Sequence, residues 1–166
     1  MKAELFSTDF IISILLFLSV LVILGLYYEN LQTDVYEQYI RNDMQRKAIN
    51  VADVLATSSG SPQFWNSSNV KVIGLYDSGK FNLTKFRELV QYFDHETVKR
   101  MMGTGVYNLN INLKNETGSV IEIGEIVYSF GLPLTDVKDA VAIKRLGIAD
   151  LETENKKVIM EVILWV

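Results

Sequence analysis

The chain has 166 residues, of which 49% are apolar, and its formal net charge is −4 at pH 7. That length has room for one domain of ordinary size plus an anchor, but not for two soluble domains. Positive and negative residues are interspersed, which argues against nucleic acid as a partner. The chain contains no cysteine, which excludes disulfide bonds and thiolate metal sites.

The first feature along the chain is an apolar run over residues 10–28, which contains no charged residue and no proline. As a helix this run would be about 28 Å long, which is close to the hydrocarbon thickness of a bilayer. Only Lys2 precedes it as a basic residue, and no small-x-small cleavage motif follows it, so an ordinary secretory signal is disfavoured. Tyr27 and Tyr28 resemble an aromatic anchor at a membrane interface. We therefore expect residues 1–28 to be a retained membrane-spanning segment.

A helical pattern continues beyond this segment, because apolar residues recur at every third or fourth position. This apolar stripe consists of Leu31, Val35, Tyr39 or Ile40, Met44, Ala48, Val51 or Ala52, and Leu55. Helix-breaking residues gather over residues 57–62 and end the pattern. We expect one helix over residues 8–57, whose amphipathic second part, within residues 29–60, packs through the stripe on its own domain.

Residues 61–166 show strand and turn patterns and are predicted to form a β-rich head. Asn82 can cap a short helix that continues to Phe93, and Asp94 or His95 can start a second that ends at Gly103. Strands are predicted over residues 70–75, 107–113, 119–128, 137–148 and 156–166, the last four forming two hairpins. Alternation of apolar residues with asparagines predicts one polar face for the second of these strands, whereas the last is apolar on both faces and should be covered. The expected fold is α+β, with the long N-terminal helix packed on a mostly antiparallel sheet.

The apolar helix is introduced by Phe-Ser-Thr-Asp-Phe at residues 6–10. Such a helix, continuing into an amphipathic half that carries a β-rich head, resembles an archaeal type IV pilin or pilin-like protein. In one archaeal branch the processing motif is roughly lysine-glycine, the cut, glutamine, an aliphatic residue, serine, a variable residue, an acid and phenylalanine. Residues 7–10 match its second half, whereas Glu4 and Leu5 stand where glycine and glutamine are expected.

The resemblance implies a pilin-like fold and a structural role, as a pilin or minor pilin in a cell-surface filament used for adhesion or attachment. It implies that residues 1–28 form the filament core, where the N-terminal helix contacts copies of itself or related subunits. It also implies that the head is extracellular and that a prepilin peptidase cuts near Glu4, Leu5 and Phe6. It further implies that Asp9 aids assembly by pairing with the N-terminal amine of a neighbouring subunit.

The residues themselves leave a second role for Asp9 open. In a first helical turn, with Ser7 or Thr8 as cap, its carboxylate would be stabilised by the helix dipole at the membrane surface. A second function is likewise open for the whole chain. It would be a single-pass membrane-anchored protein whose head binds a partner in a membrane or envelope complex.

No enzymatic activity, cofactor or metal site is expected. The sequence has no glycine-rich phosphate loop, nucleophile elbow or paired-histidine motif. His95 is the only histidine, and its position beside Asp94 at a predicted helix start favours capping and solvation.

Three tripeptides match the pattern for N-glycosylation, and they begin at Asn66, Asn82 and Asn115. Each lies at a predicted loop or turn, where a glycan can be attached if the head is outside the cell. Phe64 and Trp65 precede the first of them and are expected to plug the underside of the head.

Overall fold

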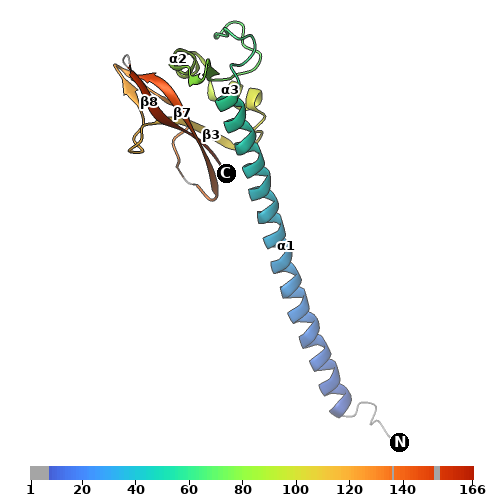
Figure 1. Cartoon of the computed structure of the whole chain (residues 1–166). Helices are drawn as coiled ribbons and strands as arrows, with labels where there is room; N and C mark the ends of the chain where they lie inside the picture. The colour runs from blue at the N-terminus through green and yellow to red at the C-terminus, as the bar shows by residue number, and fades with distance from the viewer. Residues whose placement is uncertain (1–7, 136, 152–153) are drawn as a thin grey trace, which may run out of the picture. The chain divides into compact units, whose positions relative to one another are not determined.

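The structure is a computed structural model that describes residues 8–135, 137–151 and 154–166. The chain forms two compact units, Met1–Ile40 and Arg41–Val166, which we call the N-terminal and C-terminal units. One helix, α1 (Thr8–Thr57), belongs to both units (Figure 1). Its bounds confirm the single long helix that the sequence predicts.

Among the residues of the N-terminal unit that the structure describes, α1 is the one element, and no second element of this unit covers it. All side chains that the structure describes from Asp9 to Tyr39 are exposed. The prediction that the apolar stripe packs on its own domain is therefore wrong for Leu31 and Val35. At the next stripe position, predicted as Tyr39 or Ile40, Tyr39 is exposed and Ile40 is half-buried. A lone helix offers the exposed side chains no apolar surface to pack against.

In the C-terminal unit, the same helix lies in the core. The buried members of the stripe are Met44, Ala48, Val51, Ala52 and Leu55, none more than 2% exposed. The backbone after the helix turns back onto it, since the N–H of Leu75 donates to the carbonyl oxygen of Leu55 (3.1 Å). The prediction of a helix packed on its own domain is thus confirmed from Met44 onward.

The described part of the C-terminal unit contains a six-stranded sheet in the order β1-β2-β7-β8-β3-β6. The strands are β1 (Tyr76–Asp77), β2 (Lys80–Phe81), β3 (Asn108–Lys114), β6 (Ser129–Gly131), β7 (Ala140–Leu151) and β8 (Glu154–Trp165). All neighbours are antiparallel except β2 and β7, which pair in parallel through Phe81 and Ala149. A separate hairpin joins β4 (Glu122–Ile123) to β5 (Ile126–Val127). The α+β class and the mostly antiparallel sheet are confirmed.

The strand β8 is the best-covered strand, as its sequence predicts. It pairs with β7 along its whole length, from Ala140↔Trp165 to Leu151↔Glu154, and with β3 on its other side. Its second half is buried on both faces of the sheet. This central position explains why apolar residues fill both faces of the strand.

The strand β3 differs from the prediction of one polar face, because Asn110 and Asn112 are buried too. The Asn110 Nδ2 donates to the carbonyl oxygen of Leu132 (3.0 Å), and the Ser129 hydroxyl donates to Asn112 Oδ1 (2.6 Å). Residues 129–132 therefore give each of these amides one hydrogen bond, while Asn110 Oδ1 has no partner among the described residues. Buried amides are tolerated where they are hydrogen-bonded in this way.

Two predicted strands are wrong. Residues 70–75 form no strand, since Val72 makes only an isolated bridge with Ser61, and strand pairing begins at Tyr76. The stretch 119–128 is not one strand either. It makes a bridge from Val120 to Lys114, and then the β4–β5 hairpin folds back, because the N–H of Tyr128 donates to the carbonyl oxygen of Ile121 (2.9 Å).

The two short helices are confirmed as α2 (Leu83–Tyr92) and α3 (His95–Met102). Asn82 caps α2 by accepting the N–H of Lys85, and Asp94 caps α3 by accepting the N–H of Thr97. Gly103 ends α3 in the left-handed conformation, with φ of 66°.

Candidate functional site

The first candidate site is the apolar surface of α1 in the N-terminal unit. Asp9–Glu29 is long and apolar enough to cross a membrane, with 21 residues, a mean hydropathy of 2.9 and no buried residue in its most apolar window. At the standard rise this segment is about 31 Å long. That length matches the hydrocarbon core of a bilayer.

Asp9 lies in the first turn of α1, and its side chain is exposed. The N-terminal end of a helix carries partial positive charge, which favours a carboxylate at this place. The predicted processing residues Glu4, Leu5 and Phe6 lie outside the described residues, as does the predicted cap at Ser7.

The small residues of this segment leave its surface apolar. The Ser13 hydroxyl donates to the carbonyl oxygen of Asp9 (2.8 Å), and the Ser19 hydroxyl donates to that of Leu15 (2.7 Å). These bonds within the helix satisfy both hydroxyls without a partner helix. A methyl group at Gly25 would meet no atom within 4 Å, so a neighbouring helix can approach closely there.

Apolar and aromatic side chains continue on α1 beyond Glu29. We call the surface made by Tyr28, Leu31, Gln32, Val35, Tyr36 and Tyr39 the neck surface. It is open and predominantly apolar, and each of its side chains is exposed. Exposed apolar patches of this kind mark places where a protein meets another molecule.

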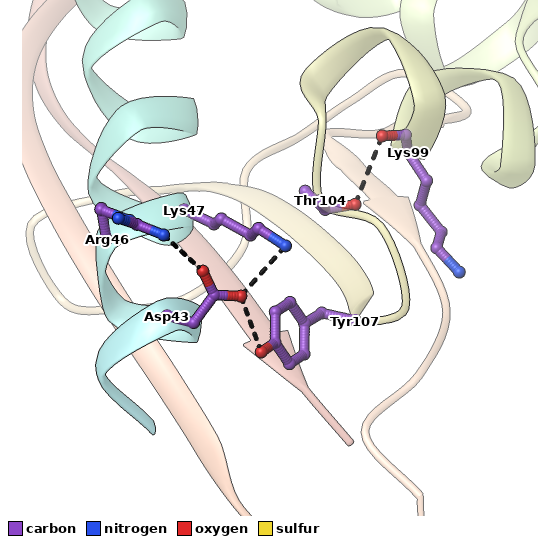
Figure 2. Close-up of polar contacts among 6 residues, drawn as sticks. All are labelled: Asp43, Arg46, Lys47, Lys99, Thr104 and Tyr107. Carbon is purple, nitrogen blue, oxygen red and sulfur yellow. Dashed lines mark hydrogen bonds and ion pairs between the residues drawn. The ribbon is translucent and has the colours of Figure 1, made fainter. Parts of the chain in front are cut away.

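The second arrangement is a polar cluster at the start of the C-terminal unit, shown in Figure 2. The Asp43 carboxylate accepts hydrogen bonds from Arg46 (2.7 Å), Lys47 (3.0 Å) and the Tyr107 hydroxyl (2.9 Å). The Lys47 ammonium also lies 4.9 Å from the centre of the Tyr107 ring. Together these contacts tie α1 to the segment that leads into β3.

The charges around Asp43 make this cluster a structural contact rather than a ligand site. The hydrogen bond from Lys47, followed by those from Arg46 and Tyr107, lowers the pKa of Asp43 from 3.8 to about 2. The carboxylate is therefore ionised and already accepts three donors. The backbone leading to Tyr107 is held in turn by Thr104, whose hydroxyl donates to the carbonyl oxygen of Lys99 (3.4 Å, Figure 2).

The three predicted glycosylation asparagines lie in different settings. Asn66 is exposed, and its Oδ1 accepts the N–H of Ser68 (2.9 Å) in a turn whose residues are also exposed. Asn115 is half-buried, and its Oδ1 accepts both the Thr117 hydroxyl (2.6 Å) and a backbone N–H. Asn82 is half-buried at the start of α2, where Oδ1 caps the helix. Asn66 is thus the most accessible of the three.

The predicted aromatic plug is confirmed for one residue and wrong for the other. Trp65 is 4% exposed, and its Nε1–H donates to the carbonyl oxygen of Gly74 (2.9 Å). Phe64 is 78% exposed. The neighbouring side chains face opposite ways, so only Trp65 fills the core.

His95 also differs from its prediction as a capping and solvated residue. Asp94 provides the cap, while the His95 ring stacks on Phe130 with 6.4 Å between the ring centres. The sequence carries no signal for this contact or for the Asp43–Tyr107 contact, because their partners are far apart along the chain. Comparisons with protein-family models, with curated proteins and with solved structures found no match.

Proposed function

We propose that this chain is a structural subunit of an archaeal type IV pilus-like surface filament, a pilin or minor pilin that serves adhesion or attachment. Its partners are the membrane before assembly and, within the filament, copies of itself or related subunits. The contacts between subunits run through α1. The β-rich head lies outside the cell.

The length of the exposed apolar surface on α1 carries this proposal. Exposed apolar side chains extend from Phe10 to Tyr39, which is about 44 Å along a helix. The hydrocarbon core of a bilayer covers only about 30 Å of that length. A lone anchor would leave the neck surface in water, whereas helices of neighbouring subunits would cover it.

Asp9 also supports the proposal, because a carboxylate in an apolar environment needs a partner that lowers its free energy. A carboxylate at the centre of a bilayer costs about 2.5–3.5 kcal/mol on insertion scales. Asp9 stands at the head of the apolar segment, where it enters a filament core together with the helix. Pairing with the N-terminal amine of a neighbouring subunit offsets that cost. The positive end of the helix dipole offsets it further.

We also propose that the head is glycosylated at Asn66. Its exposed amide is open to a transferase, whereas Asn82 is held at the start of α2. Peptide mass mapping of protein from native cells should find sugar on Asn66 and none on Asn82. An unmodified Asn66 on a surface-exposed head would overturn the assignment.

The second candidate is a single-pass membrane protein whose head binds a partner in a membrane or envelope complex. The match between Asp9–Glu29 and the bilayer thickness favours it, together with Tyr27 and Tyr28 at the interface. This candidate explains the membrane segment but leaves the neck surface uncovered.

Isolation of surface filaments from the native cells tests the proposed function. Filaments sheared from the cells should contain this chain by mass spectrometry, with an N-terminus at Leu5 or Phe6, the predicted region of processing. Deletion of the gene should remove or shorten the filaments in electron micrographs. A chain that starts at Met1 and stays in the membrane fraction, in cells whose filaments are unchanged, would favour the second candidate.

A further inference from the structure

The ring of His95 occupies an enclosed place at the start of α3. It stacks on Phe130 of β6 with 28° between the ring planes, and Phe130 is itself buried. Both ring nitrogens are shielded from solvent, and neither has a hydrogen-bond partner among the residues that the structure describes. A histidine without any partner is unusual, because polar atoms at such places are nearly always hydrogen-bonded.

The environment of this ring favours its neutral form. Burial is the main cause that lowers the pKa of His95 below 6.5, and the positive charge of Lys99 adds to it. Asp94 and Glu96 act in the opposite direction with a weaker effect. These charged groups belong to α3 or its cap, while β6 contributes the uncharged ring of Phe130.

Protonation of His95 would destabilise this contact. A neutral imidazole buries one donor and one acceptor, but its cation would bury two N–H donors and a full charge without a partner. The positive end of the helix also disfavours a cation at the first residue of α3. The charged ring gains both water and hydrogen bonds if it swings out of the stack.

We propose that the stack of His95 on Phe130 is an acid-sensitive latch, which holds the start of α3 on β6 while the ring is neutral and opens when the ring takes up a proton. This latch is independent of filament assembly. Opening therefore exposes the apolar ring of Phe130, which is buried while the latch is closed.

The direction of the pH effect follows from the two states of the latch. The open ring titrates near its ordinary pKa of about 6.5, and the closed ring titrates lower. The open state therefore binds more protons, and the latch weakens as the pH falls from 6.5 toward the pKa of the closed ring. The Asp43 cluster stays ionised throughout this range, since its pKa is about 2. Acid thus acts on α3 and leaves the contact between Asp43 and Tyr107 in place.

Nuclear magnetic resonance of the full chain in detergent micelles tests the latch directly. His95 is the only histidine, so a sample labelled with ¹³C-histidine gives one imidazole signal to titrate. The expected midpoint lies below 6.5. A midpoint at or above 6.5 in the folded protein would overturn the proposal without any variant.

Hydrogen exchange then tests whether α3 opens. As the pH falls through the range below 6.5, the protection factors of α3 should decrease, by up to about tenfold for each unit that separates the two pKa values. The α2 amides serve as an internal control and should keep their protection factors. His95→Phe preserves an aromatic stack but removes the titration, so its α3 should show no such decrease. An equal decrease in the wild type and His95→Phe, or in α2 and α3, would contradict the latch.

Discussion

The two parts of α1 contain the same kinds of residue but differ in burial. Val35 is 66% exposed and Leu31 is 42% exposed, whereas Val51 is 2% exposed and Leu55 is fully buried. Composition and helical period do not distinguish these pairs. The difference is that the C-terminal unit supplies a sheet and two further helices, while the described part of the N-terminal unit consists of α1 alone. Under the proposed function, helices of neighbouring subunits would supply the partner of the N-terminal part.

Alanine substitutions of Leu55 and Leu31 should change the free energy of unfolding by very different amounts. Leu55→Ala removes a fully buried side chain and should lower the free energy of unfolding by about 2–5 kcal/mol. Leu31→Ala should change it by less than about 0.5 kcal/mol, because that side chain is exposed. Denaturant titration in detergent measures both, and fluorescence reports on the C-terminal unit because Trp65 and Trp165 are buried there. Equal losses in the two variants would contradict the comparison.

Two glycines, Gly131 in the C-terminal unit and Gly25 in the N-terminal unit, should show the same difference with a smaller change in stability. A Cβ at Gly131, where φ is 108°, would lie 2.1 Å from the carbonyl oxygen of Leu109. Gly131→Ala should therefore destabilise the C-terminal unit by about 1–3 kcal/mol. Gly25→Ala meets no neighbouring atom and should leave the unfolding of that unit unchanged. The same denaturant titration measures both. An unchanged free energy of unfolding for Gly131→Ala would contradict the close approach of Gly131 to Leu109.

The polar cluster at Asp43 predicts an acid effect confined to the C-terminal unit. Its folded pKa of about 2 lies below the ordinary 3.8, so its stabilisation is full above pH 3.8 and is lost as the pH falls toward 2. The loss should be on the order of 2 kcal/mol in the wild type. Asp43→Asn should lack this acid-dependent loss and should be less stable at pH 5. Matching acid profiles for both proteins would show that Asp43 gains nothing from Lys47, Arg46 and Tyr107.

Local patterns predicted the elements whose signals lie close together in the sequence. The caps at Asn82 and Asp94, the end of α1 near Thr57 and the long β7–β8 hairpin were all predictable. A cap or a hairpin is determined by a few neighbouring residues, so it can be predicted from the local sequence.

Other features depend on partners that only the fold brings together. The asparagines of β3 alternate like a solvent-facing row, yet residues 129–132 cover them. The contact of Asp43 with Tyr107 joins residues 64 positions apart, so no local sequence pattern predicts it. For the candidate site, the sequence predicted the apolar segment and the asparagines, but not that the neck surface is exposed or that Asn66 is the most accessible of the three.

The most direct test of the account asks whether the neck surface is covered in native cells. The chain has no cysteine, so Val35→Cys and Glu37→Cys each introduce a single thiol. The two positions lie on nearly opposite sides of α1, about 200° apart, and both side chains are exposed in the isolated chain. A water-soluble maleimide should react with both in detergent, but in intact filaments it should react with Glu37→Cys and spare Val35→Cys. Equal reaction of the two cysteines in the native assembly would contradict the claim that other subunits cover this surface.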